Sequence, residues 1–314
     1  MSRPLVIQTE DLSANAVAFL RERCELVQCP VGDEARFAEV IGGADALVVR
    51  TYTRVDAALL ARAPRLKVVG RAGVGLDSID VEACKARGVR VVYTPDANSR
   101  AVAEYVFAML FDALRPRVFL ERALPTPEWN TLRRELLAPR ELGSLTLGVL
   151  GLGRIGTRVA RIGAGFGMRV LYHDVREIKE ENRAGATPVS RDELYTMSDV
   201  ISIHVDNRPE NRHCVGDRVL DLCKPDAIIV NAARGFIVDA AALAAFLHAN
   251  PNARALLDVH DPEPFREDSP LLGLPNAHLS PHIAAATSEA HENMSAVVHD
   301  VWRVLNGQQP VHGA

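Results

Sequence analysis

The stretch from Leu145 to Asp174 constrains the fold of this chain more than any other. It opens with an apolar run, Leu145–Leu150, that can form a strand buried on both faces. Gly151, Gly153 and Gly156 follow in the pattern G-x-G-x-x-G, at the point where a helix should begin. Such glycines permit a tight turn, let a pyrophosphate approach bare backbone, and allow close contact between helix and strand. The pattern therefore predicts a dinucleotide-binding unit.

The residues after the glycines complete this unit. Ile155, Val159 and Ile162 recur at helical spacing, and glycines 163, 165 and 167 are expected to end the helix before a strand at 168–172. The helix N-terminus offers N–H groups and partial positive charge to phosphates. Asp174 follows about 20 residues after the glycines, where a carboxylate can accept hydrogen bonds from a ribose 2′-OH. An ordinary βα turn can also collect glycines, but the acid at this distance favours dinucleotide binding, and NAD over NADP.

The composition excludes several classes of protein. The chain has 314 residues, 48% hydrophobic and 24% charged, as is typical of a soluble globular protein with two domains. Its net charge of −4 argues against nucleic acid as a partner. It contains no apolar run of membrane-spanning length, and Met1–Pro4 does not resemble a signal peptide. The five cysteines form no C-x-x-C pair, which favours buried thiols in the cytoplasm over disulfides or a metal site.

The rest of the chain alternates strands with helices, which predicts an α/β fold of two domains with doubly wound parallel sheets. The expected strands are 5–7, 46–49, 66–69, 89–92, 200–204, 227–231, 255–258 and 278–280, and the expected helices of the first part are 12–23, 55–62 and 79–86. A long helix should follow a cap at Asn98 or Ser99 and be interrupted at Pro116. A last helix, 288–306, should fold back on the first domain. We therefore expect a substrate domain of residues 1–97 plus 288–314 and a nucleotide-binding domain of residues 98–287.

Three polar residues follow predicted strand ends, where the reactive face of a bound cofactor should lie. They are Arg234, Glu263 and His282. A histidine can donate the proton that ketone reduction requires near neutral pH, and a neighbouring carboxylate would raise its pKa and orient it. An arginine can bind a substrate carboxylate through two parallel hydrogen bonds. Each could also be unremarkable, as a surface arginine, a loop carboxylate or a core histidine, but their placement on three successive strand ends favours a catalytic site.

With these motifs the chain resembles the D-isomer-specific 2-hydroxyacid dehydrogenase family over nearly its whole length. The motifs that carry the resemblance are Gly70–Asp77, Asn98 through Glu104, Trp129, Gly151–Gly156, Asn231–Gly235, Leu257–Val259 through Glu263–Pro264, and Ser280–Ala284. The resemblance implies that His282 is the acid/base, Glu263 its partner, and Arg234 the anchor for the substrate's carboxylate and keto oxygen. It also implies that the N–H groups of Val74 and Gly75 hold that carboxylate from the other domain, in a cleft that closes around both ligands.

The resemblance further implies a set of residues that contact NAD. Val102 would lie beside the cofactor and Asp258 near the nicotinamide amide. The remaining members of the set are Gly151, Gly153, Arg154, Ile155, Gly156, Asp174, His204, Val205, Ala232, Ala233, Arg234 and His282. After His204 the family usually continues with Pro-Leu-Thr, whereas this chain has Val205-Asp206-Asn207-Arg208 on the adenine side of the pocket.

The sequence does not select one 2-hydroxy acid. Glutamine replaces Glu263 in formate dehydrogenases of the family, and D-lactate dehydrogenases usually carry aromatics after His282, so both branches are disfavoured. Arg71, with Arg133 and Arg134, could bind a phosphate, which favours 3-phosphoglycerate and phosphohydroxypyruvate. Hydroxypyruvate or glyoxylate reduction is the alternative, and Arg133-Arg134 could equally be a solvated helix face.

Two further expectations concern partners and a different function. The resemblance implies a homodimer built on residues 98–142. The family's C-terminal-binding corepressors keep the same fold and catalytic trio, so an NAD(H)-sensing binding protein is the alternative outside enzymes. The chain ends at Ala314, which leaves no room for the regulatory domain that some phosphoglycerate dehydrogenases carry.

Overall fold

The computed structural model describes residues 3–115, 117–138 and 140–314. The chain forms two compact units, one of Met1–Asn98 with Ala286–Ala314 and the other of Ser99–Ala285. The expected helix break at Pro116 lies outside the described residues, as do Met1 and Ser2.

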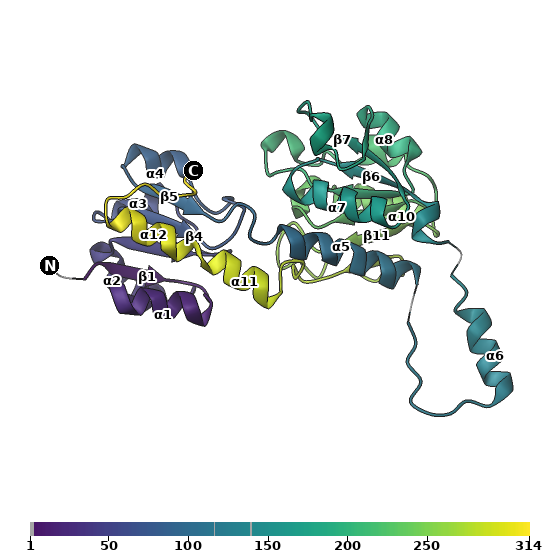
Figure 1. Cartoon of the computed structure of the whole chain (residues 1–314), viewed down its shortest axis with the longest axis horizontal. Helices are drawn as coiled ribbons and strands as arrows, with labels where there is room; N and C mark the ends of the chain where they lie inside the picture. The colour runs from purple at the N-terminus through teal and green to yellow at the C-terminus, as the bar shows by residue number, and fades with distance from the viewer. Residues whose placement is uncertain (1–2, 116, 139) are drawn as a thin grey trace. The chain divides into compact units, whose positions relative to one another are not determined.

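The first unit is a five-stranded parallel sheet in the order β2-β1-β3-β4-β5 (Figure 1). Its strands are β1 (Leu5–Gln8), β2 (Glu25–Gln28), β3 (Ala46–Val49), β4 (Val68–Arg71) and β5 (Arg90–Tyr93). Its helices are α1 (Ala14–Arg23), α2 (Glu34–Val40), α3 (Ala57–Arg62), α4 (Val81–Ala86), α11 (Ser288–Ser295) and α12 (Val297–Leu305).

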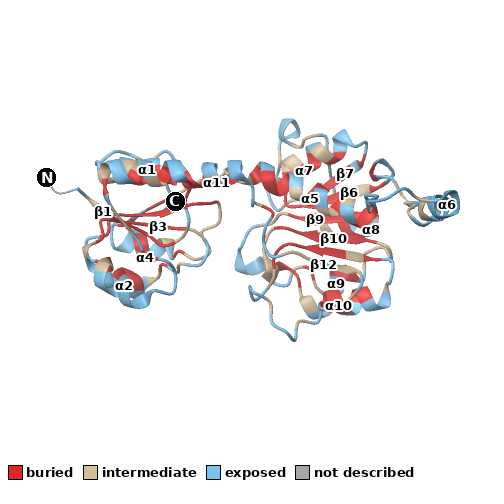
Figure 2. Ribbon diagram, turned by 90° about the horizontal axis from the view of Figure 1, so that it is seen from below, coloured by how far each residue is buried: buried red, intermediate tan, exposed pale blue. Residues whose placement is uncertain are grey.

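Helices cover both faces of this first sheet because successive strand residues point to opposite sides. Ile7, Leu47 and Val69 pack with residues of α3 and α4, whereas Val6, Val48 and Val68 pack with α1 and α12. Figure 2 shows the strands of this sheet coloured mostly as buried, with helices on either side of them.

The end of the chain completes the first unit. Gly70 in β4 leaves room for α12, since a Cβ there would lie 2.4 Å from Val301 Cγ2. Beyond α12, Gly313 bridges Val92 in antiparallel fashion, and the N–H of Tyr93 donates to the carbonyl of His312. The C-terminal segment thus supplies α12 to the core and pairs with β5 at the edge of the sheet.

The second unit is a seven-stranded parallel sheet in the order β12-β11-β10-β9-β6-β7-β8. Its strands are β6 (Thr146–Leu150), β7 (Arg169–His173), β8 (Thr187–Pro188), β9 (Val200–Ile203), β10 (Ile228–Asn231), β11 (Arg254–Leu257) and β12 (Ala277–Leu279). Its helices are α5 (Ser99–Leu114), α6 (Thr126–Glu135), α7 (Arg154–Gly165), α8 (Arg191–Met197), α9 (Asp217–Leu220) and α10 (Ala240–Ala249).

The second sheet is also covered on both faces. Residues of α5 and α7, including Phe107 and Val159, share one buried cluster with Val149, while α8, α9 and α10 pack on the opposite face. The strand order reverses between β6 and β9, and ligands of doubly wound sheets bind at the strand C-termini beside this reversal. The predicted doubly wound α/β class is confirmed.

Several local expectations were wrong. The edge strand β2 and the helix α2 were not predicted, and the expected last helix is two helices, α11 and α12. Gly163 does not end α7: it lies inside the helix, where a Cβ would be 2.6 Å from Leu147 Cδ2, so it permits close packing on β6 instead. None of the helices in the described part of the chain is long and apolar enough to span a membrane.

Candidate active site

Gly151 and Gly153, between β6 and α7, and Gly156, in the first turn of α7, fit the predicted dinucleotide turn. Gly151 has φ +91°, and a Cβ there would lie 2.9 Å from the carbonyl carbon of His204. A Cβ on Gly156 would lie 2.1 Å from the carbonyl oxygen of Gly151. At Gly153, in contrast, no described atom lies within 4 Å of a built Cβ, and no side chain caps the N-terminus of α7. The turn therefore offers open space against bare N–H groups, as a pyrophosphate requires.

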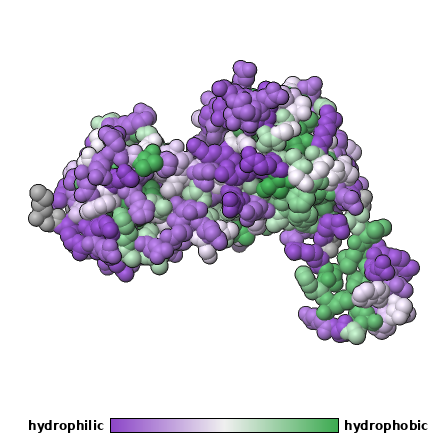
Figure 3. Space-filling view, in the orientation of Figure 1, coloured by the Kyte–Doolittle hydropathy of each residue, from purple (hydrophilic) through white to green (hydrophobic). Residues whose placement is uncertain are grey.

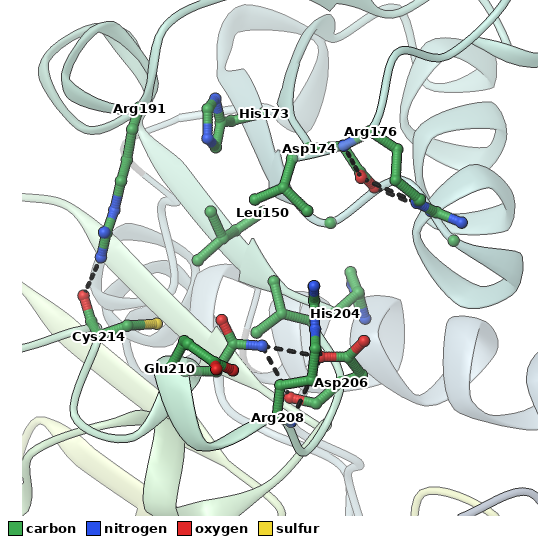
Figure 4. Close-up of a pocket in the computed structure, with 15 residues that line it drawn as sticks. Leu150, His173, Asp174, Arg176, Arg191, His204, Asp206, Arg208, Glu210 and Cys214 are labelled. Atoms are coloured by element: carbon green, nitrogen blue, oxygen red, sulfur yellow. Dashed lines mark hydrogen bonds and ion pairs between the residues drawn. The ribbon is translucent and has the colours of Figure 1, made fainter.

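A cavity of about 540 Å³ adjoins this turn at the C-terminal ends of β6, β7 and β9 (Figure 4). Its wall combines Gly151 and Gly153 with charged side chains, among them Asp174, Arg176 and Arg208. The cavity lies where the adenosine half of a dinucleotide would extend from the glycine turn. Asp174 was predicted from the sequence to bind the ribose, whereas Arg176 was not predicted as a site residue.

The carboxylate of Asp174 is already bound by four donors. Its Oδ2 accepts from the N–H of Leu152 at 2.8 Å and from Arg176 Nη2 at 3.0 Å, and its Oδ1 accepts from Arg176 N at 2.9 Å and Nε at 3.0 Å. Burial alone would raise the pKa of Asp174, but the hydrogen bonds from Arg176 and Leu152 outweigh it and lower the pKa. The Asp174 side chain is 5% exposed and that of Arg176 64%, so a ribose hydroxyl can bind the carboxylate only if Arg176 moves aside.

The unusual segment after β9 forms a loop held by its own side chains. Asp206 Oδ1 accepts from Arg208 Nε at 2.8 Å and from Asn211 Nδ2 at 2.9 Å, and both partners line the cavity. His204 Nε2 lies 2.7 Å from Ser202 Oγ, and burial lowers the pKa of His204 to about 3, so this ring is neutral. Asp206 and Arg208 therefore form a second ion pair in the wall of the cavity, in addition to that of Asp174 with Arg176.

The other implied cofactor residues lie in or beside the buried clusters of the second unit. Val102 and Ala232 belong to the cluster on the α5–α7 face, with Ile155 packed against it. Val205 and Ala233 pack against the cluster on the opposite face, and Arg154, the first residue of α7, is exposed.

The loop that carries Arg234 is organised by Asn231, the last residue of β10. Asn231 is 1% exposed; its Nδ2 donates to the carbonyl of Arg234 at 2.8 Å, and its Oδ1 accepts from the N–H of Ala233 at 3.0 Å. Arg234 Nη1 donates to the carbonyl of Ala233 at 2.6 Å. The next residue, Gly235, packs directly on the loop that leads to Glu263, since a Cβ there would lie 1.9 Å from the carbonyl carbon of His260.

Glu263 and His282 form a hydrogen-bonded pair. His282 Nδ1 lies 2.7 Å from Glu263 Oε2, with side chains 44% and 31% exposed, respectively. Because the carboxylate can only accept, Nδ1 carries the proton and Nε2 is left for another ligand. Burial would raise the pKa of Glu263, but hydrogen bonds from the His282 ring and the His260 N–H outweigh it and lower the pKa. The acid is thus charged at neutral pH and accepts the hydrogen bond from Nδ1 of the His282 ring.

Asp258 fixes the backbone around His282. This fully buried carboxylate accepts from Ser280 Oγ at 2.6 Å and from the N–H groups of Ile283 at 2.9 Å and Ala284 at 2.7 Å. His282 itself has φ +56°, a conformation that non-glycine residues rarely adopt and that the surrounding structure must impose. The Asp258 carboxylate is therefore committed to the His282 turn, a role that the family resemblance did not imply.

In the first unit, the residues expected to bind substrate follow β4. Arg71 lies over Gly73, which has φ +147°, and Arg71 Nη1 donates to the carbonyl of Ala72 at 3.1 Å. Val74 and Gly75 continue this loop and are half-buried. Arg50, which follows β3, was not predicted as a site residue; because Val49 pairs with Arg71, Arg50 and Arg71 lie at the same end of neighbouring strands, with side chains that start on opposite faces of the sheet. Arg50 Nη1 lies 3.1 Å from His291 Nδ1.

Comparison with known proteins identifies the family. The model of the D-isomer specific 2-hydroxyacid dehydrogenase NAD-binding domain matches residues 107–284. The glyoxylate reductase of Aeropyrum pernix is 37% identical over 303 residues, which cover 94% of this chain and 90% of that protein. The chain belongs to the D-isomer-specific 2-hydroxyacid dehydrogenases. The predicted family, its NAD-binding domain and its oxidoreductase class are confirmed.

Other 2-hydroxyacid dehydrogenases that match carry names of different substrates. The D-3-phosphoglycerate dehydrogenase of Mycobacterium tuberculosis strain H37Rv is 38% identical over 305 residues, 97% of this chain but 57% of that protein. The chain therefore spans little more than half the length of that relative. The crystal structure of D-lactate dehydrogenase from Aquifex aeolicus, complexed with NAD and lactic acid, matches with a TM-score of 0.80 and 30% identity over 96% of both chains. The substrate of this dehydrogenase is not fixed by these similarities.

Proposed function

We propose that this dehydrogenase transfers a hydride between NAD(H) and a small D-2-hydroxy or 2-keto acid, with His282 as the acid/base. The observation that carries this proposal is the 2.7 Å hydrogen bond between His282 Nδ1 and Glu263 Oε2. It leaves His282 Nε2 to donate a proton to the substrate oxygen during reduction and to take it back during oxidation. Glu263 stabilises the protonated ring at Nδ1.

Arg234 binds the substrate in this proposal. Its planar guanidinium can hold the carboxylate through paired hydrogen bonds and polarise the keto group. When bound, NADH supplies the hydride to the carbonyl carbon while His282 supplies the proton to the oxygen, so the 2-hydroxy acid forms without another reactant. The turn at Gly151, Gly153 and Gly156 holds the pyrophosphate, with Arg154 and Ile155 in the first turn of α7.

Asp174 selects NAD in this proposal, after Arg176 has moved from its carboxylate. The ribose 2′-OH would replace Arg176 as the hydrogen-bonding partner, and a 2′-phosphate would be repelled. We expect Asp174→Ala to weaken NADH binding and to reduce the difference in affinity between NADH and NADPH. Fluorescence titration measures the Kd of each cofactor. Arg161→Ala, an exposed arginine on α7, is the control. Tighter NADPH than NADH binding by the parent would contradict this assignment.

A phosphorylated three-carbon acid is the substrate that we favour. Arg71 ends β4 and its guanidinium lies over Gly73, where it suits a phosphate on a substrate whose carboxylate the Val74–Gly75 loop would bind. Arg133 and Arg134, both exposed in the last turn of α6, are further candidates for the same ligand.

The substrate test compares kcat/KM for phosphohydroxypyruvate and hydroxypyruvate in the parent and Arg71→Ala. We expect the parent to prefer the phosphorylated acid by about tenfold or more, or about 1.4 kcal/mol, and the variant to lose most of that preference. Arg87→Ala, an exposed arginine in the same unit, should change neither value. Equal efficiency in the parent would instead favour hydroxypyruvate or glyoxylate reduction. No turnover with any 2-keto acid would favour an NAD(H)-sensing protein.

We further propose that the enzyme is a cytoplasmic homodimer that uses the segment around α6. No residue of α6 is buried, and Phe119 and Leu137 on either side of it are each 81% exposed. Figure 3 shows an apolar patch on this segment beside hydrophilic residues, and a second copy of the chain would cover that patch. Sedimentation equilibrium should give twice the chain mass of 34.2 kDa, and Phe119→Glu with Leu137→Glu should give the monomer. A monomeric parent would exclude the proposal.

A further inference from the structure

We propose that His260 is a positioning residue that holds the Glu263–His282 pair in its productive geometry. This inference rests on the proposed function of that pair. His260 follows β11 and contacts each of the three segments that carry Arg234, Glu263 and His282, although its own side chain is not part of the proposed catalytic trio.

The first contact is with Glu263. The N–H of His260 donates to Glu263 Oε1 at 2.8 Å, while the other carboxylate oxygen accepts from His282. The two oxygens of one carboxylate thus bind a fixed backbone donor and the acid/base ring. The orientation of Glu263 toward His282 therefore depends on where the backbone of His260 lies.

The second contact is with the segment that carries His282. His260 Nε2 lies 2.8 Å from the carbonyl oxygen of Ser280, two residues before His282. Because a carbonyl can only accept, Nε2 carries the proton and donates this bond. The ring of Phe265 packs edge-on against His260, with centroids 4.7 Å apart, and restricts the ring to this orientation. The His260 ring therefore ties the Glu263 loop to the end of β12.

The third contact is with the Arg234 loop. The Cα of Gly235 lies so close to His260 that a Cβ would be 1.9 Å from its carbonyl carbon and 2.0 Å from its oxygen. The backbone of His260 is thus enclosed between the loop after β10 and its own hydrogen bond to Glu263. A substitution that changes only the His260 ring can therefore test the role of the ring without disturbing this backbone packing.

These contacts matter because the Glu263–His282 pair is partly exposed. Side chains that are 31% and 44% exposed are not held by packing alone, and a displacement of about 1 Å can cost about a hundredfold in rate. The charged groups around His260 are Glu263 and Asp261 on its own loop, His282 after β12, and Arg212, which pairs with Asp261 at 3.3 Å. The ring's bond to Ser280 is the link that a substitution can remove while leaving these charges in place.

The test removes the donor of the ring and then restores it. His260→Phe keeps an aromatic ring against Phe265 but cannot donate to Ser280, and His260→Gln offers an N–H donor again. We expect His260→Phe to lower kcat by about 10- to 100-fold while the Kd for NADH changes by less than about twofold. His260→Gln should recover most of the lost kcat. His248→Phe is the matched control, because His248 also bonds a carbonyl, that of Ala244, but within α10.

A double-mutant cycle separates positioning from a general loss of structure. If His260 acts through Glu263, His260→Phe should change kcat by less than about twofold in a Glu263→Ala background, which lacks both side-chain oxygens. An equal loss in both backgrounds would overturn the proposal.

A readout without cofactor or substrate keeps this test separate from that of the proposed function. In protein with ¹³Cε1-labelled histidine, the NMR titration midpoint of His282 should move to lower pH in His260→Phe and return toward the parent value in His260→Gln. An unchanged midpoint in a folded His260→Phe variant would overturn the positioning role. A parent protein without turnover would overturn only the proposed function, since the titration would still report the link.

Discussion

Removing the charge of Glu263 tests the central feature of the site. Glu263→Gln keeps the size of the side chain and an oxygen that can accept from His282 Nδ1, but it removes the anion that stabilises the protonated ring. Reduction of a keto acid requires that ring to be protonated, so the variant should lose activity at lower pH than the parent. The low pKa of Glu263 means that the parent carries this anion throughout the neutral range.

The exposure of the pair sets the size of the effect. Two unit charges about 4 Å apart interact by about 1 kcal/mol in water and about 4 kcal/mol at an effective dielectric constant of 20. Because Glu263 and His282 are each about one-third to one-half exposed, we take a value between these limits, about 1.4 to 2.7 kcal/mol. This energy corresponds to about 1 to 2 pH units in the midpoint of the rate profile.

The measurement is kcat/KM for reduction of a 2-keto acid by NADH between pH 5 and 9. We expect the midpoint of the high-pH limb of the Glu263→Gln profile to shift to lower pH by about 1 to 2 units. The rate on the low-pH plateau should change less. Glu267→Gln, four residues further along the same loop, should keep the parent profile. If Glu263→Gln keeps it as well, the electrostatic role of Glu263 is refuted, whatever happens to the absolute rate.

Three further predictions address the turn, the substrate anchor and the stability of the second unit. Gly156→Ala should weaken NADH binding by about tenfold or more and lower the free energy of unfolding by about 1 to 3 kcal/mol, because its Cβ would lie 2.1 Å from a backbone oxygen. Calorimetric titration measures the first effect and urea unfolding the second. Arg234→Lys should mostly raise KM for the keto acid and leave NADH binding intact, since an ammonium cannot reproduce the planar fork; a KM like that of the parent would argue against this anchor. Asp199→Asn should lower the free energy of unfolding at pH 7 by about 1 to 2 kcal/mol, because it removes a buried carboxylate from its ion pairs with the half-buried side chains of Arg140 and Lys224. Burial would raise the pKa of Asp199, but its hydrogen bonds lower it, so its contribution is present above the unfolded pKa and the difference should shrink as pH falls through the folded one.

The parts of the fold that the sequence predicts are those with a strong local pattern. The strand β6, the turn at Gly151 and the helix α7 could be predicted because apolar runs and glycine spacing lie within 30 consecutive residues. The edge strand β2 was missed because its four residues are exposed or half-buried and show no apolar run. The helix α2 has no buried residue, and its apolar stripe is short, since only Phe37 and Val40 pack against the core.

The site residues likewise divide into those that the sequence predicts and those that it does not. Glu263 and His282 could be proposed as partners from their positions after strands, and the structure places them in contact, although their catalytic roles stay predictions. Arg176 was missed even though it stands two residues after Asp174, a spacing at which a long side chain can fold back on an acid. The structural roles of Asp258 and His260 could not be predicted, because they depend on contacts with residues about 20 or more positions away along the chain.

The pairing of the chain's end with the first sheet has a consequence for how the protein is made. Residues Val297, Val298 and Val301 belong to the core of the first unit, but the ribosome synthesises them after the whole of Ser99–Ala285. The second unit is one continuous stretch and can fold as soon as it has left the ribosome, whereas the part made first has to wait with Val6, Val48 and Val68 covered by α1 but not yet by α12. The N-terminal unit is therefore the last to complete its core, and an unfinished chain exposes its sheet to chaperones for as long as the second unit takes to be translated.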